Sequence, residues 1–275
     1  AGFAAYVWQG VGPSEEAVAA MQSSSMRCSP RPDGGFLFER LGSSSIGLVI
    51  FYAGAKVAPV SYAPLAQAVV DLGASMLVVQ SPFNGRRPFQ GGIPVFKAPP
   101  VSVLLADIDA ARYANSMVIA GHSGGGLWAI DYCLEMFNAG KWPQASGSEP
   151  ETAIHFCYVG VHGPDLAKYR ELPFASTTYL YATNDWSLQP FRKNYLLPAG
   201  IAEVESVDEY VTRVASDQLA PDCRVVGING GNHGQFGSYG YPGRREGYFF
   251  DEIEASADMP EERQRGIVAE ALVAP

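Results

Sequence analysis

Short apolar runs alternate with helical patterns between residues 34 and 183, and this alternation limits the possible folds more than any other feature. Most of the runs are apolar at every position, as is typical of strands buried on both faces of a parallel sheet. The sequence therefore predicts an α/β fold with a mostly parallel central sheet flanked by helices on both faces. We expect strands at residues 35–39, 46–52, 75–79, 116–120, 153–159, 177–181 and 224–228, and helices at residues 14–22, 62–72, 101–113, 125–138, 204–214 and 261–272.

The length of 275 residues suits one large α/β domain, and a hydrophobic content of 47% can fill its core. We expect a single domain over residues 1–275, with residues 1–33 as an N-terminal extension. Two irregular stretches, residues 82–100 and 186–221, interrupt the alternation. The first follows the carboxyl end of a predicted strand, where ligands bind in open α/β sheets, which favours a lid or pocket wall. For the second, a pocket insertion and an ordinary surface insertion are equally supported.

The chain carries a formal net charge of −9. This charge disfavours nucleic acids and anionic membrane surfaces as partners. The apolar runs of the chain have the length of strands and fall short of the roughly 20 residues that cross a bilayer, so no membrane span is expected in this sequence.

Four cysteines are present. Cys133 lies in a predicted helix and Cys157 in a predicted strand, so both are expected to be buried free thiols. Cys28 and Cys223 lie in less regular sequence, and a disulfide between them is an alternative for a secreted chain. No cysteine or histidine pair has the spacing of a structural zinc site, so no metal is expected.

The sequence Gly121-His122-Ser123-Gly124-Gly125 lies between the predicted strand at residues 116–120 and an amphipathic stretch at residues 127–137. A Gly-x-Ser-x-Gly sequence between a strand and a helix predicts a nucleophile elbow, a turn too sharp for larger flanking residues. The serine hydroxyl would stand exposed above the sheet. The Gly124 amide, at the start of the helix, would be an oxyanion donor. The alternative is a glycine-rich turn that only joins two elements.

A nucleophilic serine needs a neighbouring base, and the chain has four histidines. His122 should project away from the serine, and His155 lies in the middle of a predicted strand. His233 follows the last predicted strand in a loop with four glycines, which is where this type of site carries its base. His162 follows an earlier strand and either lines the substrate pocket or is a polar turn residue. We therefore expect His233 to be the base.

The base needs a carboxylate to hold its tautomer. Asp185 directly follows the predicted strand at residues 177–181, between the serine and the base in sequence. Asp165 follows the preceding strand and is the competing candidate. We favour Asp185.

The second oxyanion donor should come from the loop after an early strand. The small residues after the strand at residues 46–52 meet this requirement, and the Ala55 amide is the favoured donor, with Lys56 as the alternative. Among the aromatic residues, Trp186 and Phe83 are candidates for the substrate pocket.

These segments carry a resemblance to the α/β-hydrolase superfamily, in the group of dienelactone-hydrolase-like and esterase-like proteins. The similar segments are residues 51–57 with 61–66, 121–125, 183–185 and 231–240. The resemblance implies Ser123 as nucleophile, Asp185 as acid and His233 as base. The chain departs from the pattern in having Gly54-Ala55 where relatives commonly have a glycine pair. The 48 residues from the acid to the base also suggest an inserted helical segment around residues 201–219.

The predicted activity is hydrolysis of a small-molecule carboxylic ester through an acyl-enzyme, and this chemistry requires no cofactor. An acyltransferase, thioesterase, lipase or lactone hydrolase would use the same residues. An α/β hydrolase that is catalytically silent and serves as a binding module is the alternative from a different class.

Overall fold

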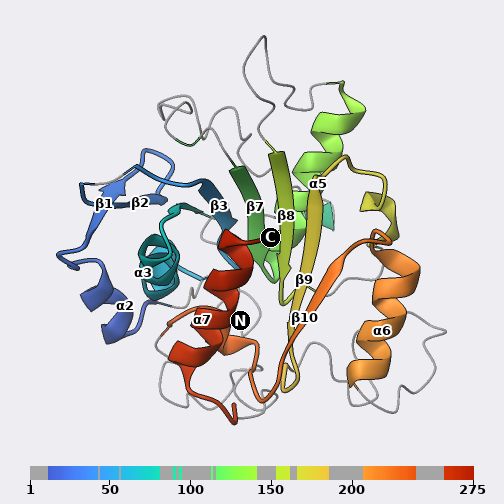
Figure 1. Ribbon diagram of the computed structural model, residues 1–275. Helices are drawn as coiled ribbons and strands as arrows, with labels where there is room; N and C mark the ends of the chain where they lie inside the picture. Colours follow the sequence, from blue (N-terminus) through green and yellow to red (C-terminus); the bar gives the residue numbers. More distant parts are fainter. Residues whose placement is uncertain are drawn as a thin grey trace.

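The computed structural model describes residues 12–42, 44–55, 57–80, 89–90, 93–94, 113, 116–140, 153–161, 166–185, 207–239 and 257–275. Eight strands form one sheet in the order β1-β2-β4-β3-β7-β8-β9-β10 (Figure 1). Their bounds are β1 Met26–Pro30, β2 Phe36–Arg40, β3 Leu48–Tyr52, β4 Ser75–Val79, β7 Ser116–His122, β8 Ala153–Val159, β9 Ser176–Ala182 and β10 Arg224–Ile228.

Strand β2 pairs antiparallel with both of its neighbours, β1 and β4. The six strands from β4 to β10 in the sheet order pair parallel to one another. Their carboxyl ends therefore meet at one edge of the sheet, although the residues that follow them are far apart in sequence.

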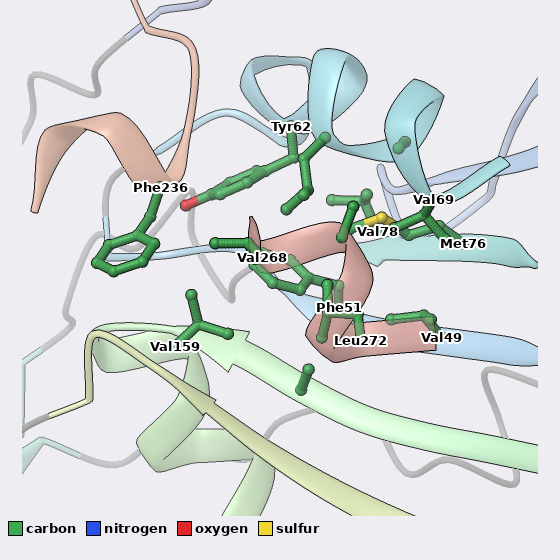
Figure 2. Close-up of a cluster of buried hydrophobic side chains, with 14 of the residues drawn as sticks. Val49, Phe51, Tyr62, Val69, Met76, Val78, Val159, Phe236, Val268 and Leu272 are labelled. Carbon is green, nitrogen blue, oxygen red and sulfur yellow. The ribbon is translucent and has the colours of Figure 1, made fainter. Parts of the chain in front are cut away.

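Helices cover both faces of the sheet. They are α2 Glu15–Ala20, η1 Pro59–Tyr62, α3 Ala63–Asp71, α5 Gly124–Asn138, η4 Ala167–Tyr169, α6 Val207–Gln218, η5 Gly234–Phe236 and α7 Glu261–Val273. Helices α5 and α6 contribute to one buried cluster, and α3 and α7, which lie side by side, contribute to the other. Figure 2 shows this second cluster, in which Val268 and Leu272 of α7 face Val49 and Phe51 of β3.

The predicted fold class is confirmed, and strands β4, β8 and β10 have the predicted bounds. Strand β1 was not predicted, because its sequence Met-Arg-Cys-Ser-Pro has no apolar run; it is an edge strand that only one neighbour covers. Within residues 82–100 the structure describes a two-stranded ladder, β5 Phe89–Gln90 with β6 Ile93–Pro94. Of the predicted helix at residues 101–113, all but Tyr113 lies outside the described residues.

All four cysteines are free. Cys133 and Cys157 are buried as predicted, and burial raises the pKa of both thiols. The alternative of a Cys28–Cys223 disulfide is wrong: Cys28 lies on β1 and Cys223 directly precedes β10, and these two strands form opposite edges of the sheet.

Two features are absent from the described residues. No helix among them has both the length and the apolar character needed to cross a membrane. In the same part of the chain, no three histidine, cysteine or acidic side chains are grouped as they would be around a metal ion.

Candidate active site

Ser123 lies at the junction of β7 and α5, in a backbone conformation that is unfavourable for a residue with a side chain. Its φ is 53° and its ψ is −126°, and it is the one non-glycine residue with positive φ in the described part of the chain. Such a conformation costs about 1–3 kcal/mol and persists only where neighbouring structure holds it. The Ser123 N–H donates to the Val159 carbonyl at 3.0 Å, and the Ser123 carbonyl accepts from Gly126 N–H at 3.1 Å. The predicted sharp turn at the serine is therefore present.

The glycines around Ser123 allow this turn to pack against the end of β3. A Cβ atom on Gly125 would lie 2.3 Å from the Ala53 carbonyl oxygen and 2.4 Å from that of Tyr52. A Cβ atom on Gly121 would lie 2.6 Å from the Gly126 nitrogen. Since all these atoms belong to backbone, a side chain at either position would force the chain apart.

Asp185 and His233 form a buried hydrogen-bonded pair. The distance from His233 Nδ1 to Asp185 Oδ2 is 2.8 Å, and Asp185 is 0% exposed. Asp185 follows β9 in a turn closed by its own N–H on the Ala182 carbonyl, and His233 follows β10 in the glycine-rich loop. A carboxylate accepting from Nδ1 directs the other ring nitrogen, Nε2, to the opposite side of the ring as the atom that can take a proton.

The sheet brings this pair to the edge at which Ser123 lies, because β7, β8, β9 and β10 are consecutive parallel neighbours. The Val159 carbonyl accepts the Ser123 N–H, and Gly160 directly follows Val159. A Cβ atom added at Gly160 would lie 3.5 Å from Asp185 Oδ2. The ring of His122, the residue before Ser123, lies 4.5 Å from the His233 ring, centroid to centroid. Ser123, Asp185 and His233 therefore occupy one region of the molecule.

The two candidate oxyanion donors also lie close together. A Cβ atom on Gly124 would be 3.3 Å from the Ala55 Cβ and 3.8 Å from the Ala55 amide nitrogen. Gly124 is the first residue of α5, and Ala55 follows β3, the neighbour of β7 in the sheet. A helix start offers amide groups without a partner inside the helix.

His122 lies inside this region. We expected only that it would project away from Ser123, and its ring lies against the rings of His233 and Phe236. It is 2% exposed, and its Nδ1 is 2.9 Å from the Tyr62 hydroxyl oxygen. The expectation for His155 is confirmed: it is a sheet residue on β8 whose Nδ1 is 2.8 Å from Ser176 Oγ, and burial lowers its pKa.

Gln264 of α7 is a further residue that sequence reasoning missed. Its side chain forms two hydrogen bonds with the backbone of Asn232, the residue before His233. The Asn232 N–H donates to Gln264 Oε1 at 3.1 Å, and Gln264 Nε2 donates to the Asn232 carbonyl at 2.8 Å. Gln264 is 0% exposed. No local pattern in the sequence indicates this contact, because a glutamine on a helix is usually a surface residue.

Several predicted positions lie outside the described residues. They are Lys56, Phe83, His162, Asp165 and Trp186.

The sheet order, the two helical layers and the turn at Ser123 define the α/β-hydrolase fold. Residues 48–138, from β3 to the end of α5, match the sequence model of the family described as "Alpha/beta hydrolase family". The match includes the turn at Ser123 and one candidate oxyanion turn, and it ends before Asp185 and His233.

Solved structures of esterases and lipases share this fold. Carboxyl esterase 2 of the mycorrhizal fungus Tuber melanosporum is 14% identical, with a TM-score of 0.53 and coverage of 92% of this chain and 89% of that chain. An esterase of Pyrobaculum calidifontis is 11% identical, with a TM-score of 0.51 and coverage of 94% and 90%. A hormone-sensitive lipase from a metagenome library is 10% identical, with a TM-score of 0.52 and coverage of 94% and 92%. No curated protein sequence matches the chain.

Proposed function

We propose that this protein is a serine hydrolase that cleaves carboxylic esters, with Ser123 as nucleophile, His233 as base and Asp185 as the acid that orients the base. The observation that carries the proposal is the buried Asp185–His233 hydrogen bond of 2.8 Å, at the sheet edge where Ser123 adopts its strained turn. A buried carboxylate on Nδ1 of a histidine stabilises the imidazolium that forms when the histidine takes a proton. The family match over residues 48–138 supports the same function for the turn.

The reaction has two steps. His233 Nε2 removes the proton from Ser123 as the serine oxygen attacks the ester carbonyl, and the amides of Gly124 and Ala55 stabilise the oxyanion. The imidazolium then gives its proton to the departing alcohol, which leaves an acyl group on Ser123. A water molecule then gives a proton to His233 and attacks the acyl carbonyl. As the bond from the acyl carbon to the Ser123 oxygen breaks, the imidazolium returns this proton to the serine oxygen, and the carboxylic acid is released.

The choice of an ester as substrate is supported by the fold and by the names of the similar structures, two esterases and a lipase. We place the chain in the dienelactone-hydrolase-like and esterase-like group as part of the proposal, on the residues of the elbow, acid turn and histidine loop. His162, Trp186 and Phe83 remain our candidates for the substrate pocket.

The test is hydrolysis of p-nitrophenyl esters of increasing acyl length by the wild-type protein and four variants. We expect Asp185→Asn to lower kcat by about 10⁴-fold, and Ser123→Ala and His233→Gln to lower it by about 10⁶-fold, the usual sizes of such losses. Asp165→Asn should change kcat little. If Asp165→Asn abolishes turnover and Asp185→Asn does not, the acid is wrongly assigned.

Two matched controls separate catalysis from packing. Ser75→Ala removes a buried serine at the amino end of β4, and His155→Gln removes a histidine bonded within the sheet. Both should keep wild-type kcat. A fluorophosphonate probe should add its mass to the peptide that contains Ser123. Absence of both labelling and ester turnover in the folded wild-type protein would refute the proposed function.

A further inference from the structure

A single hydroxyl group links the two turns that would form the oxyanion site. Gly54 N–H donates to the Tyr62 hydroxyl oxygen at 2.9 Å, and the same oxygen lies 2.9 Å from His122 Nδ1. Gly54 directly precedes Ala55, and His122 directly precedes Ser123. Figure 2 shows the Tyr62 ring within the apolar cluster, with its hydroxyl directed toward the side of Phe236.

The Tyr62 hydroxyl can act as donor and acceptor at once. Its oxygen accepts the Gly54 N–H and keeps its own hydrogen for a second bond. We assign this hydrogen to His122 Nδ1, 2.9 Å away, as part of the proposal below. In this arrangement Nδ1 carries no proton, and His122 is neutral with its proton on Nε2. Burial raises the pKa of Tyr62 well above its ordinary value, so the donor hydrogen is present throughout the neutral range.

The space around the hydroxyl supports a fixed geometry. Tyr62 is 0% exposed, and its ring lies 5.0 Å from that of Phe51, centroid to centroid. A Cβ atom on Gly54 would lie 2.8 Å from His122 Nδ1 and 3.0 Å from the Tyr62 oxygen. The oxyanion turn and the elbow therefore approach each other as closely as a glycine allows.

The neutral state of His122 matters because of its neighbour. Its ring lies 4.5 Å from the His233 ring, which gains a positive charge when it takes the serine proton. A second cation at that distance would oppose this charge. A neutral His122 instead presents an aromatic surface that packs beside the base without repelling it.

We propose that Tyr62 is a positioning residue, which ties the oxyanion turn at Gly54–Ala55 to the elbow and holds His122 as the neutral Nε2–H tautomer beside the base. This inference rests on the proposed function, since it assigns Tyr62 a role in placing the donors and the base. Tyr62 acts through Gly54 and His122 and need not touch the substrate.

The test compares Tyr62→Phe with Tyr113→Phe. Tyr113 is a matched control: it is also buried, and its hydroxyl also makes a hydrogen bond, to Glu39 Oε1 at 2.7 Å. It lines a small cavity together with Ser75, the first residue of β4. This cavity therefore lies at the amino end of a parallel strand, whereas the candidate site lies at the carboxyl ends. Tyr62→Phe should lower kcat about tenfold and leave KM within twofold, as expected when one hydrogen bond that orders the site is lost. Tyr113→Phe should leave both constants within twofold.

A transition-state analogue separates positioning from general destabilisation. Inhibition by a boronic acid that forms a tetrahedral adduct should weaken in Tyr62→Phe by the same factor as kcat/KM falls. The pair His122→Asn and His122→Leu adds a second comparison, because the asparagine oxygen can accept the Tyr62 hydrogen and leucine cannot. His122→Asn should keep more activity. If Tyr62→Phe matches the control in kcat and inhibitor affinity, the positioning role is refuted while the proposed function stands.

Nitrogen-15 NMR of the histidine rings gives a readout that does not depend on turnover. The wild-type His122 signals should show the neutral Nε2–H tautomer, and Tyr62→Phe should shift them toward a mixture. A proton on Nδ1 would overturn the Tyr62–His122 link even in an active enzyme. An inactive wild-type protein would refute the proposed function, and with it the positioning role.

Discussion

Replacement of Gln264 by methionine tests whether α7 holds the loop that carries His233. Methionine has a similar length and an unbranched chain, so it can fill the same space without the amide. The change removes both hydrogen bonds to Asn232, one of 3.1 Å from its N–H and one of 2.8 Å to its carbonyl. A Cβ atom on Gly231 would lie 2.4 Å from Gln264 Oε1, so the glutamine is packed directly against this loop.

The expected loss of stability follows from what the substitution leaves behind. Asn232 is 8% exposed, so its N–H and carbonyl would lose these two bonds in a place with little access to water. A buried polar group without a partner costs about 1–3 kcal/mol, and two such groups together cost about 2–6 kcal/mol. We expect the free energy of unfolding to fall by about 4 kcal/mol, near the middle of that range.

Urea unfolding followed by circular dichroism measures this change, with Gln67→Met as the control. Gln67 lies on α3, and its amide bonds the side chains of Ser25 and Asp71, so no backbone group is left buried by the substitution. The control should lower the free energy of unfolding by less than about 0.5 kcal/mol. In Gln264→Met, kcat should also fall, because the residue before the base is no longer fixed. A loss of stability below about 1 kcal/mol would show that the two bonds do not hold the loop.

Three shorter predictions concern other parts of the molecule. Gly125→Ala should destabilise the protein by more than about 3 kcal/mol in thermal unfolding, because its Cβ would meet two backbone oxygens. Gly266→Ala on α7, where an added Cβ would meet no neighbouring atom within 4 Å, should stabilise the protein by up to about 1 kcal/mol. Equal effects of the two substitutions would refute the steric argument. Burial lowers the pKa of His155 from 6.5, so the unfolded chain binds the proton more readily, and stability should fall as the pH drops below about 6.5. When the urea midpoint is measured from pH 5 to 8, His155→Gln should flatten its fall at low pH. An unchanged slope of the midpoint against pH would contradict this prediction. Burial raises the pKa of Cys28 to about 11, so iodoacetamide at pH 8 should modify this thiol slowly in the folded chain. After unfolding in urea without reductant, mass spectrometry should find four carbamidomethyl groups, one on each cysteine. A count of only two carbamidomethyl groups would indicate a disulfide.

The sheet was predictable where the sequence carries enough local information. Strands β4, β8 and β10 are bounded by turn residues, and their bounds follow from the pattern. The turn at Ser123 was predictable for the same reason, since its glycines and its flanking strand and helix are consecutive in sequence. The Asp185–His233 contact required one more step: both residues follow strands, and the carboxyl ends of parallel strands share an edge.

The contacts around these residues could not be predicted in this way. Tyr62 and His122 are 60 residues apart, and Gln264 and Asn232 are 32 residues apart. Neither pair lies at equivalent positions after two strands, so the order of the strands does not predict that the two residues are in contact. Their pairing depends on how η1 and α7 pack against the sheet, which is decided by the shapes of many apolar side chains at once.

One backbone hydrogen bond joins these two sets of contacts. The N–H of Ser238, five residues after His233, donates to the carbonyl of Ser61 at 2.7 Å, and Ser61 directly precedes Tyr62. The histidine loop is therefore tied to the same short helix whose tyrosine hydroxyl holds Gly54 and His122. His122 in turn contacts the His233 ring, which closes a ring of contacts around the candidate site. Because the groups are joined in a closed path, none of them can shift alone without lengthening a bond or opening a contact elsewhere in the ring. The proposed donors at the oxyanion turn and the proposed base in the histidine loop, which come from distant parts of the chain, are thereby held in one geometry before any substrate arrives.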